Sequence, residues 1–172
     1  MKSEKRREGI LTRLQESNGT IKGTDLANIF KVSRQVIVQD VALLRAQGFD
    51  IIATPQGYVI PKKDKNKLIK TLALKHKTYE GMEEELEIMI DHGAKVIDVI
   101  VEHPVYGEIR GLLDIGYKKE LDEFMDKVTK ENAEPLSSLT EGIHIHTIEV
   151  PDEDSYEKMK LDLMKKGYLV KE

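Results

Sequence analysis

Residues 32–45 carry the most informative hydrophobic pattern of the chain. The apolar positions recur at spacings of four and three residues, which is typical of one buried helix face, at Ile37, Val41 and Leu44. Ser33 precedes them and has the side-chain oxygen that a helix N-cap needs. Gln35 and Gln39 stand one turn apart on another face, and glutamine can bind the N6 and N7 edge of adenine in the major groove. The pattern predicts a helix with one core face and one face that reads DNA.

Two more helices are predicted before this one. Residues 5–16 carry apolar side chains at helical spacing, and residues 24–30 form a second, shorter amphipathic stretch. Only residues 31–33 separate the second stretch from the glutamine-bearing helix. Because a brief turn between two such helices is typical of DNA-binding proteins, we expect a helix-turn-helix.

A hairpin is predicted directly after the three helices. Residues 50–53 and 58–60 are short β-prone runs, and they flank Thr54-Pro55-Gln56-Gly57, where proline and glycine favour a tight turn. This hairpin is the wing of a winged helix. The alternative is a small helical domain that binds no nucleic acid, and the order of three helices and a hairpin argues against it.

Charge is divided unequally along the chain. The formal net charge is −4, but residues 1–60 hold nine Lys or Arg against six Asp or Glu, whereas the remainder has a net charge of −7. A phosphate backbone attracts only the surface that faces it, so the first part is the candidate DNA surface. Its candidate phosphate contacts are Arg6, Arg7, Lys22, Arg34 and Arg45. Together the candidate DNA-binding residues are Ser33, Arg34, Gln35, Gln39, Arg45 and Gln56.

Length and composition indicate two domains in a reducing compartment. A chain of 172 residues suits two domains, which we place at 1–61 and 67–172, with the charged segment from Pro61 to Asn66 as linker. Cysteine is absent, which excludes disulfides and thiolate metal sites. No run of about 18 apolar residues is present, and the first segment reads as a charged helix rather than a signal peptide. We therefore expect a cytoplasmic protein without a membrane partner.

The second domain alternates strand and helix patterns. The predicted elements are a strand at 68–76, a helix at 80–91, antiparallel strands at 96–101 and 109–115 joined by 103–108, a helix around 121–128, a strand at 143–150, a helix around 156–163 and a short strand at 168–170. The first six match the ferredoxin-like split βαβ sandwich, with an extra helix and strand after it. The predicted fold class is thus α+β, with a winged helix-turn-helix followed by this sandwich.

The ferredoxin-like order has a consequence for the histidines. It places the first strand between the third and the fourth, and antiparallel to the fourth. His76, at the end of the first strand, is then expected beside His144 and His146 at the start of the fourth. The latter two are two residues apart in a strand, so both rings project from one face, roughly 7 Å apart. Since a lone histidine in a strand is usually only packed or exposed, this convergence carries the prediction of a metal site.

A carboxylate from the following helix could complete the ligand set. The candidates are Glu80, Glu83, Glu84 and Glu85. At ~100° per residue, Glu84 lies opposite the apolar stripe, whereas Glu83 and Glu85 flank it and can turn toward the sheet. We favour Glu85 and keep Glu84 as the alternative. Three imidazoles and one carboxylate suit zinc, nickel, iron or manganese better than calcium or magnesium.

At the level of motifs the chain resembles the NiaR-type transcriptional repressors of NAD biosynthesis, which join a biotin-repressor-like winged helix to a three-histidine domain. The resemblance covers essentially the whole chain. It is carried by SRQVIVQD in the reading helix, ATPQGYV in the wing, EHPVYGEIRG in the sheet domain and EPLSSLTEGIHIHTIEVPDE around the paired histidines. It implies a repressor with nicotinic acid as co-repressor, a palindromic DNA operator bound by a homodimer, and a divalent metal, nickel or zinc, on His76, Glu85, His144 and His146.

The resemblance also directs attention to the segment between the paired strands. Residues 103–108 are expected at the same end of the sheet as the histidines, so we predict one shared site. The pyridine nitrogen of nicotinate could coordinate the metal, and its carboxylate could bind Arg110 or backbone groups near Gly107. The candidate ligand-binding residues are His103, Tyr106, Glu108 and Arg110. Alternatively, His103 and Tyr106 simply close the end of the core.

Two other functions compete with a nicotinate-responsive repressor. Three histidines and a glutamate could activate a metal-bound water for hydrolysis of a small pyridine compound, but no dedicated general base is evident. A winged-helix repressor that senses the metal itself is the other alternative. His92 stands at a helix C-terminus, where the helix dipole favours an imidazolium, so we predict a structural role for it.

Overall fold

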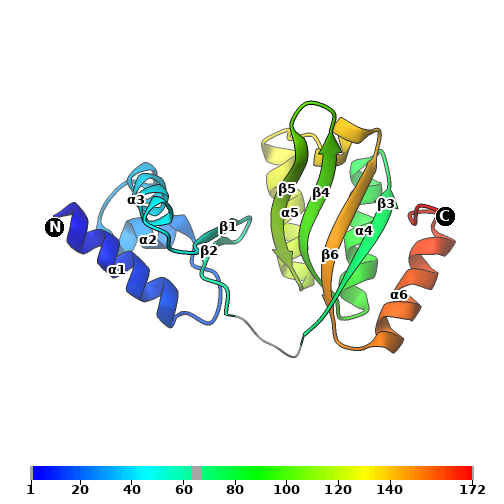
Figure 1. The fold of residues 1–172 in the computed structure, drawn as a ribbon, viewed down its shortest axis with the longest axis horizontal. Helices are drawn as coiled ribbons and strands as arrows, with labels where there is room; N and C mark the ends of the chain where they lie inside the picture. Colours follow the sequence, from blue (N-terminus) through cyan, green and yellow to red (C-terminus); the bar gives the residue numbers. More distant parts are fainter. Residues whose placement is uncertain (1, 63–66, 172) are drawn as a thin grey trace. The chain divides into compact units, whose positions relative to one another are not determined.

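The computed structural model describes residues 2–62 and 67–171, so most of the predicted linker lies outside the described residues. The chain divides into two compact units, residues 1–63 and 64–172 (Figure 1). The first unit contains α1 (Ser3–Glu16), α2 (Gly23–Phe30), α3 (Arg34–Ala46), β1 (Ile52–Thr54) and β2 (Gly57–Val59). No helix in the described ranges is long and apolar enough to cross a membrane.

The first unit is the predicted helix-turn-helix with its hairpin. Its core combines one face of each helix with the residue that enters the hairpin, namely Ile10, Leu14, Leu26, Ala27, Ile37, Val41, Leu44 and Ile51. Ser33 caps α3, since its side chain accepts the N–H of Val36. The strand β2 also pairs with the segment before α2, because Ile21 and Tyr58 exchange both backbone hydrogen bonds. At Gly57, φ is 143°, and a Cβ would lie 2.4 Å from the oxygen of Ile21, so only glycine fits.

A buried ion pair joins the first and third helices. Asp40 on α3 is 3% exposed and accepts Nε of Arg6 on α1 at 2.6 Å, with Arg7 Nη1 at 3.7 Å from its other oxygen. The hydrogen bond to Asp40 raises the pKa of Arg6 above its ordinary value. Arg6 and Arg7, which the charge pattern suggested as phosphate contacts, are thus engaged in holding the helices together.

The second unit is a four-stranded antiparallel sheet with helices packed on one face (Figure 1). Its elements are β3 (Leu68–Lys75), α4 (Tyr79–Asp91), β4 (Lys95–His103), β5 (Gly107–Ile115), α5 (Lys118–Lys130), the 3₁₀ helix η1 (Leu136–Thr140), β6 (Ile143–Val150) and α6 (Glu153–Lys165). The main core lies between the sheet and the apolar faces of α4, α5 and α6. His92 caps α4 and lies 2.9 Å from Asp162 of α6, which is a structural contact.

The strand order corrects one prediction. The sheet runs β3-β6-β4-β5, so the first strand lies at an edge and the fourth lies between the first and the second. The ferredoxin-like order had placed the first strand between the third and the fourth. Both orders make all neighbours antiparallel and let each helix crossover span one intervening strand, so hydrophobic pattern alone does not distinguish them. The antiparallel pairing of β3 with β6 is common to both and is present.

The predicted last strand is reduced to a short tail on the free edge of β3. Leu169 forms an isolated bridge with Leu74, and Lys75 and Val170 donate backbone hydrogen bonds across it to Tyr168 and Ala73, respectively. This tail covers part of the edge that the observed strand order exposes.

Loss of the Asp40 carboxylate is expected to loosen the first unit. Asp40→Ala leaves the guanidinium of Arg6 without its partner, so we expect a stability loss of about 2 kcal/mol. Hydrogen exchange of the Ile10 and Ile37 amides in the intact chain measures it. Asp50→Ala, which removes an exposed carboxylate of the same unit, is the control. Equal protection in both variants would contradict the structural role of the pair.

Candidate metal centre

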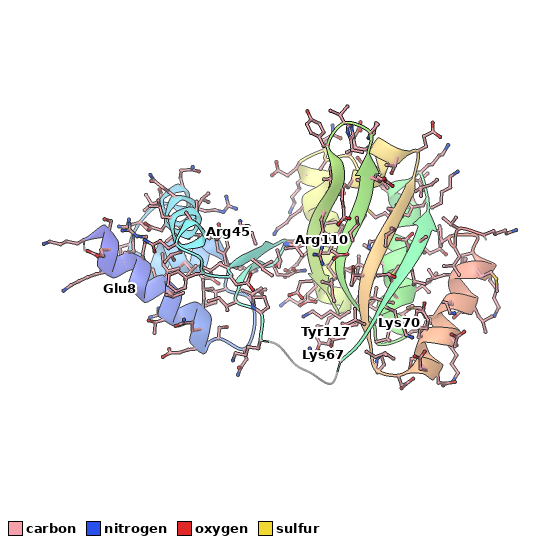
Figure 2. All side chains as sticks on the ribbon, viewed as in Figure 1. Glu8, Arg45, Lys67, Lys70, Arg110 and Tyr117 are labelled. Atoms are coloured by element: carbon pink, nitrogen blue, oxygen red, sulfur yellow. The ribbon has the colours of Figure 1, made fainter. Side chains whose placement is uncertain are left out.

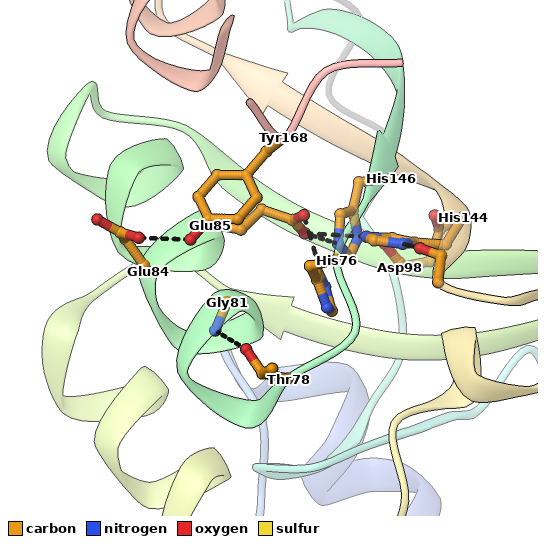
Figure 3. A network of polar contacts seen from close by, with 10 residues as sticks. His76, Thr78, Gly81, Glu84, Glu85, Asp98, His144, His146 and Tyr168 are labelled. Carbon is orange, nitrogen blue, oxygen red and sulfur yellow. Dashed lines mark hydrogen bonds and ion pairs between the residues drawn. The ribbon is translucent and has the colours of Figure 1, made fainter. Parts of the chain in front are cut away.

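Three histidines converge on one buried glutamate in the second unit (Figure 3). Oε1 of Glu85 lies 3.0 Å from Nε2 of His144 and 2.9 Å from Nε2 of His146. Its other oxygen lies 3.5 Å from Nε2 of His76. Glu85 is 0% exposed, and the three histidines are at most 8% exposed. The structure therefore brings together all four residues that the sequence suggested as metal ligands.

Strand register produces this convergence. His144 pairs with Leu74 and His146 with Leu72, so both rings project from the helix-covered face of β6. His76 follows the last residue of β3, and its backbone N–H donates to the oxygen of Gly142. Gly142 has φ of 93°, and a Cβ there would lie 2.3 Å from the oxygen of His76. This glycine lets the two chain segments approach closely enough for the three imidazoles to meet.

The first turns of α4 position the carboxylate. Thr78 caps the helix by accepting the N–H of Gly81, and Glu85 then faces the sheet one turn later. Glu84 points elsewhere: its carboxylate binds the hydroxyl of Tyr168 and Nζ of Lys166. The two side chains thus lie as the helix periodicity predicted, with Glu85 rather than Glu84 beside the histidines.

Backbone carbonyls orient two of the rings. Nδ1 of His144 lies 2.9 Å from the oxygen of Gly142, and Nδ1 of His146 lies 2.6 Å from the oxygen of Asp98. A carbonyl only accepts, so both Nδ1 atoms carry the proton. In a neutral ring, Nε2 then has the free lone pair, and it is Nε2 that faces Glu85. This is the arrangement of metal-binding histidines in general.

The electrostatics of the cluster favour opposite charges. Burial of the Glu85 carboxylate raises its pKa, but hydrogen bonds with the histidines outweigh burial and hold the pKa well below the ordinary value of 4.5. Burial lowers the pKa of His144, yet its contact with Glu85 outweighs this and leaves the pKa above 6.5. A concentrated positive charge is therefore favoured beside Glu85.

The donor set fits a divalent transition ion. The ligand atoms of His76, Glu85 and His144 lie within 4.8 Å of one another, and Nε2 of His146 contacts the same carboxylate. Two buried atoms, Nδ1 of His76 and Oε2 of Glu85, have no hydrogen-bond partner among the described residues. Nitrogen-rich ligation with one carboxylate suits zinc or nickel.

An apolar cavity of about 270 Å³ adjoins the histidines. It is lined on the other sides by α4, α5, the sheet, the segment before η1 and the first residues of η1, through Met82, Leu86, Val99, Gly111, Leu113, Phe124, Val128, Ala133, Glu134, Pro135, Leu136 and Ser137. Among these residues there is no Lys or Arg. The hydrophobic pattern does not reveal this cavity, because residues 133–137 carry no periodic pattern that would assign them to it.

The four suggested ligand-binding residues do not line this cavity. By strand alternation, Glu108 and Arg110 lie on the face of β5 opposite to the cavity-lining Gly111. The guanidinium of Arg110 binds the buried carboxylate of Asp98 (Nε to Oδ2, 2.6 Å) and so has an internal partner. His103 and Tyr106 stack on each other at the tip of the β4–β5 hairpin, with ring centroids 5.0 Å apart, and Tyr106 is 77% exposed.

The candidate DNA-binding residues gather on α3 and the wing. Ser33, Arg34, Gln35, Gln39 and Arg45 are all exposed on α3 or at its cap, and Arg45 projects from the last turn (Figure 2). Gln56 lies in the hairpin turn, where its backbone N–H donates to the hydroxyl of Thr54. Its side chain is buried, and neither amide atom has a hydrogen-bond partner among the described residues, so the structure does not present this predicted DNA contact at the surface. The exposed face of α3 offers the amide and cationic groups for contact with a duplex.

Comparison with known proteins agrees with this architecture. Residues 69–172 match the 3H domain family, and residues 6–59 match an HTH domain family. The "Probable transcription repressor NiaR" of Thermotoga maritima is 43% identical over 169 residues, which cover 98% of this chain and 95% of the relative. The "Transcription repressor NadR" of Bacillus subtilis is 41% identical over 170 residues, or 97% and 94% of the two chains.

The chain belongs to the NiaR/NadR family of transcription repressors. Membership confirms the prediction of a two-part α+β protein with an N-terminal helix-turn-helix. It also supports a DNA-binding regulator rather than a metal-dependent hydrolase.

The opposite pKa shifts predict how pH affects this repressor when chelator keeps it free of metal. Glu85 contributes to the free energy of unfolding above pH 4.5, its ordinary pKa. This contribution is lost as the pH falls through the lowered pKa of the folded state. His144 contributes to the free energy of unfolding below pH 6.5, its ordinary pKa. This contribution is lost as the pH rises through the raised pKa of the folded state. The free energy of unfolding should therefore decline above pH 6.5, and Glu85→Gln should flatten that decline. Urea titrations across this range test it, with Glu84→Gln as control; parallel profiles for wild type and Glu85→Gln would refute it.

Proposed function

We propose that this repressor controls genes of NAD biosynthesis or niacin uptake, with nicotinic acid as co-repressor beside a divalent metal in the 3H domain. His76, Glu85, His144 and His146 would hold the ion, with zinc or nickel as the best fit. The ion would supply fixed positive charge at the end of the cavity. The single observation that carries the proposal is the contact of three imidazoles with one buried carboxylate at the wall of an apolar cavity.

The cavity suits a ligand with one aromatic ring and one negative charge. Its volume of about 270 Å³ is small for a ligand pocket, and its lining is mainly aliphatic and aromatic. Because the lining has no Lys or Arg, the carboxylate of a ligand would need its positive partner at the metal end. Nicotinate meets these requirements with its carboxylate toward the histidines and its ring toward Phe124 and Leu113.

Repression would follow from linkage between ligand and DNA binding. Nicotinate would favour the arrangement of a homodimer in which two α3 helices stand one DNA turn, about 34 Å, apart. Each copy would read one half of a palindromic operator through Gln35 and Gln39, while Arg34 and Arg45 contact phosphates. Ample nicotinate would then shut off the genes for making or importing the NAD precursor.

A metal-responsive repressor is the second candidate. The four residues His76, Glu85, His144 and His146 would supply the four donors that a structural zinc site usually has, with no protein-free position for a further ligand. In that case the metal alone would set operator affinity.

Metal uptake depends on Glu85 and the paired histidines if the proposal is right. Glu85→Gln and the double variant His144→Ala with His146→Ala should each lose stoichiometric zinc or nickel, as metal analysis after dialysis measures. Glu84→Gln, one residue away and bound to Lys166 instead, is the matched control and should retain the metal. Uptake by the double variant equal to wild type would overturn the proposed site.

An operator titration separates the two candidates. Metal-loaded protein should bind operator DNA at least 10-fold more tightly with nicotinate than without it, whereas the chelated protein should show no response to nicotinate. Fluorescence anisotropy at constant salt measures both curves. Full affinity with metal alone would favour the metal-responsive repressor.

Base reading by α3 is tested with two amide deletions. Gln35→Ala and Gln39→Ala should each reduce the discrimination between operator and unrelated DNA by about 1–3 kcal/mol. Gln15→Ala, an exposed glutamine of α1, is the control and should have no effect. If both α3 variants keep the wild-type discrimination, the assigned reading face is wrong.

A further inference from the structure

Asp98 is a buried charged residue that the metal centre itself does not use. It lies on β4 at a register shift between Val96 and Asp98 and is 0% exposed. A β-bulge interrupts the regular ladder and reorients the groups around it. A carboxylate at such a position is costly to bury without partners, so its contacts indicate its role.

Two polar atoms of Asp98 hold His146 and the residue after it, and a third binds an arginine on the neighbouring strand. The main-chain oxygen lies 2.6 Å from Nδ1 of His146. The carboxylate oxygen Oδ1 accepts the N–H of Thr147, the next residue, at 3.0 Å. The other oxygen, Oδ2, binds the guanidinium of Arg110 from β5. Asp98 therefore holds the ring of His146 and the backbone that follows it, and Arg110 neutralises the charge.

We propose that Asp98 and Arg110 form a positioning pair that fixes the imidazole of His146 for metal binding. The proposal rests on the proposed function, since it gives His146 the role of ligand. The carbonyl of Asp98 keeps the proton on Nδ1, which leaves Nε2 free beside Glu85. The ion pair keeps that carbonyl in place. Partners of this kind typically change metal affinity by about 10–100-fold when they are lost.

The pair also makes His146 different from the other two imidazoles. Nδ1 of His144 is held by Gly142, which has no side chain to be anchored, and Nδ1 of His76 has no hydrogen-bond partner among the described residues. The Arg110 side chain is 49% exposed and lies on the face of the sheet opposite to the residues that line the 270 Å³ cavity. A change at this accessible position therefore reaches the buried centre through Asp98.

The test uses the full chain with three variants and one matched control. Arg110→Gln removes the charge from an accessible position, Asp98→Asn removes the buried charge, and Arg110→Lys restores a cation. Asp114→Asn breaks the comparable pair of Lys95 and Asp114 (2.6 Å) across the same two strands, and asparagine tolerates its φ of 55°. Cobalt(II) is the probe: its dissociation constant by chelator competition, and its absorption spectrum, report the ligand geometry.

We expect about 10-fold weaker cobalt binding and an altered spectrum for Arg110→Gln and Asp98→Asn, partial rescue by Arg110→Lys, and wild-type values for Asp114→Asn. The metal-free protein adds an independent readout: the Nδ1 proton of His146, assigned by its loss in His146→Gln, should exchange faster with solvent in both weakened variants. Unchanged cobalt affinity, spectrum and proton exchange would overturn the pair's role, even if the variants are less stable. If wild type takes up no cobalt, the proposed metal site fails, and the proton exchange alone decides whether Asp98 positions the ring.

Discussion

One buried carboxylate in contact with three imidazoles is the constraint around which the 3H domain is arranged. A carboxylate that is 0% exposed must have positive or hydrogen-bonding partners, because its desolvation is otherwise too costly. Among the described residues, Glu85 has only the histidines to supply them. Oε1 lies within hydrogen-bond distance of His144 and His146, whereas Oε2 lies 3.5 Å from His76 and accepts no hydrogen bond within the described ranges. Protonated rings can satisfy Glu85 at low pH, and a divalent ion can do so when the rings are neutral. The site thus couples its own stability to proton or metal occupancy.

The surrounding fold has to bring four residues from three parts of the chain to one point, and a specific structural feature places each of them. The β3–β6 pairing sets His76 beside His144, the alternation of β6 puts His146 on the same face, and the cap at Thr78 sets the phase of α4 so that Glu85 faces the sheet. Glu84, which is one residue earlier, binds Lys166 near the C-terminus instead. A phase change of one residue in α4 would exchange these roles, which explains why the helix cap matters to the candidate metal centre.

The convergence of the histidines was predicted from the antiparallel pairing of the first and fourth strands, which the ferredoxin-like order shares with the observed one. Periodicity predicted the elements of both units, because these depend on spacing along single helices and strands. Periodicity did not predict the strand order, because the observed order β3-β6-β4-β5 and the ferredoxin-like order satisfy the same local rules. Nor did it place Arg110 on the opposite face from the cavity or reveal Asp98 at a bulge, since a bulge adds one residue and shifts the alternation. The cavity itself depends on residues 133–137, an irregular segment whose position follows from tertiary packing alone.

The division into two compact units limits how the centre can influence DNA. The groups that we propose to face a duplex are on α3, whereas the histidines and the cavity lie in the other unit. In the proposed function, a ligand in the cavity would change operator affinity by binding one arrangement of units or copies better than another. The size of the response is bounded by that difference in ligand affinity and not by how tightly the ligand binds. A rigid binding site favours a large difference in ligand affinity, because a ligand held in a fixed geometry binds less well to any arrangement of the protein that deforms the site.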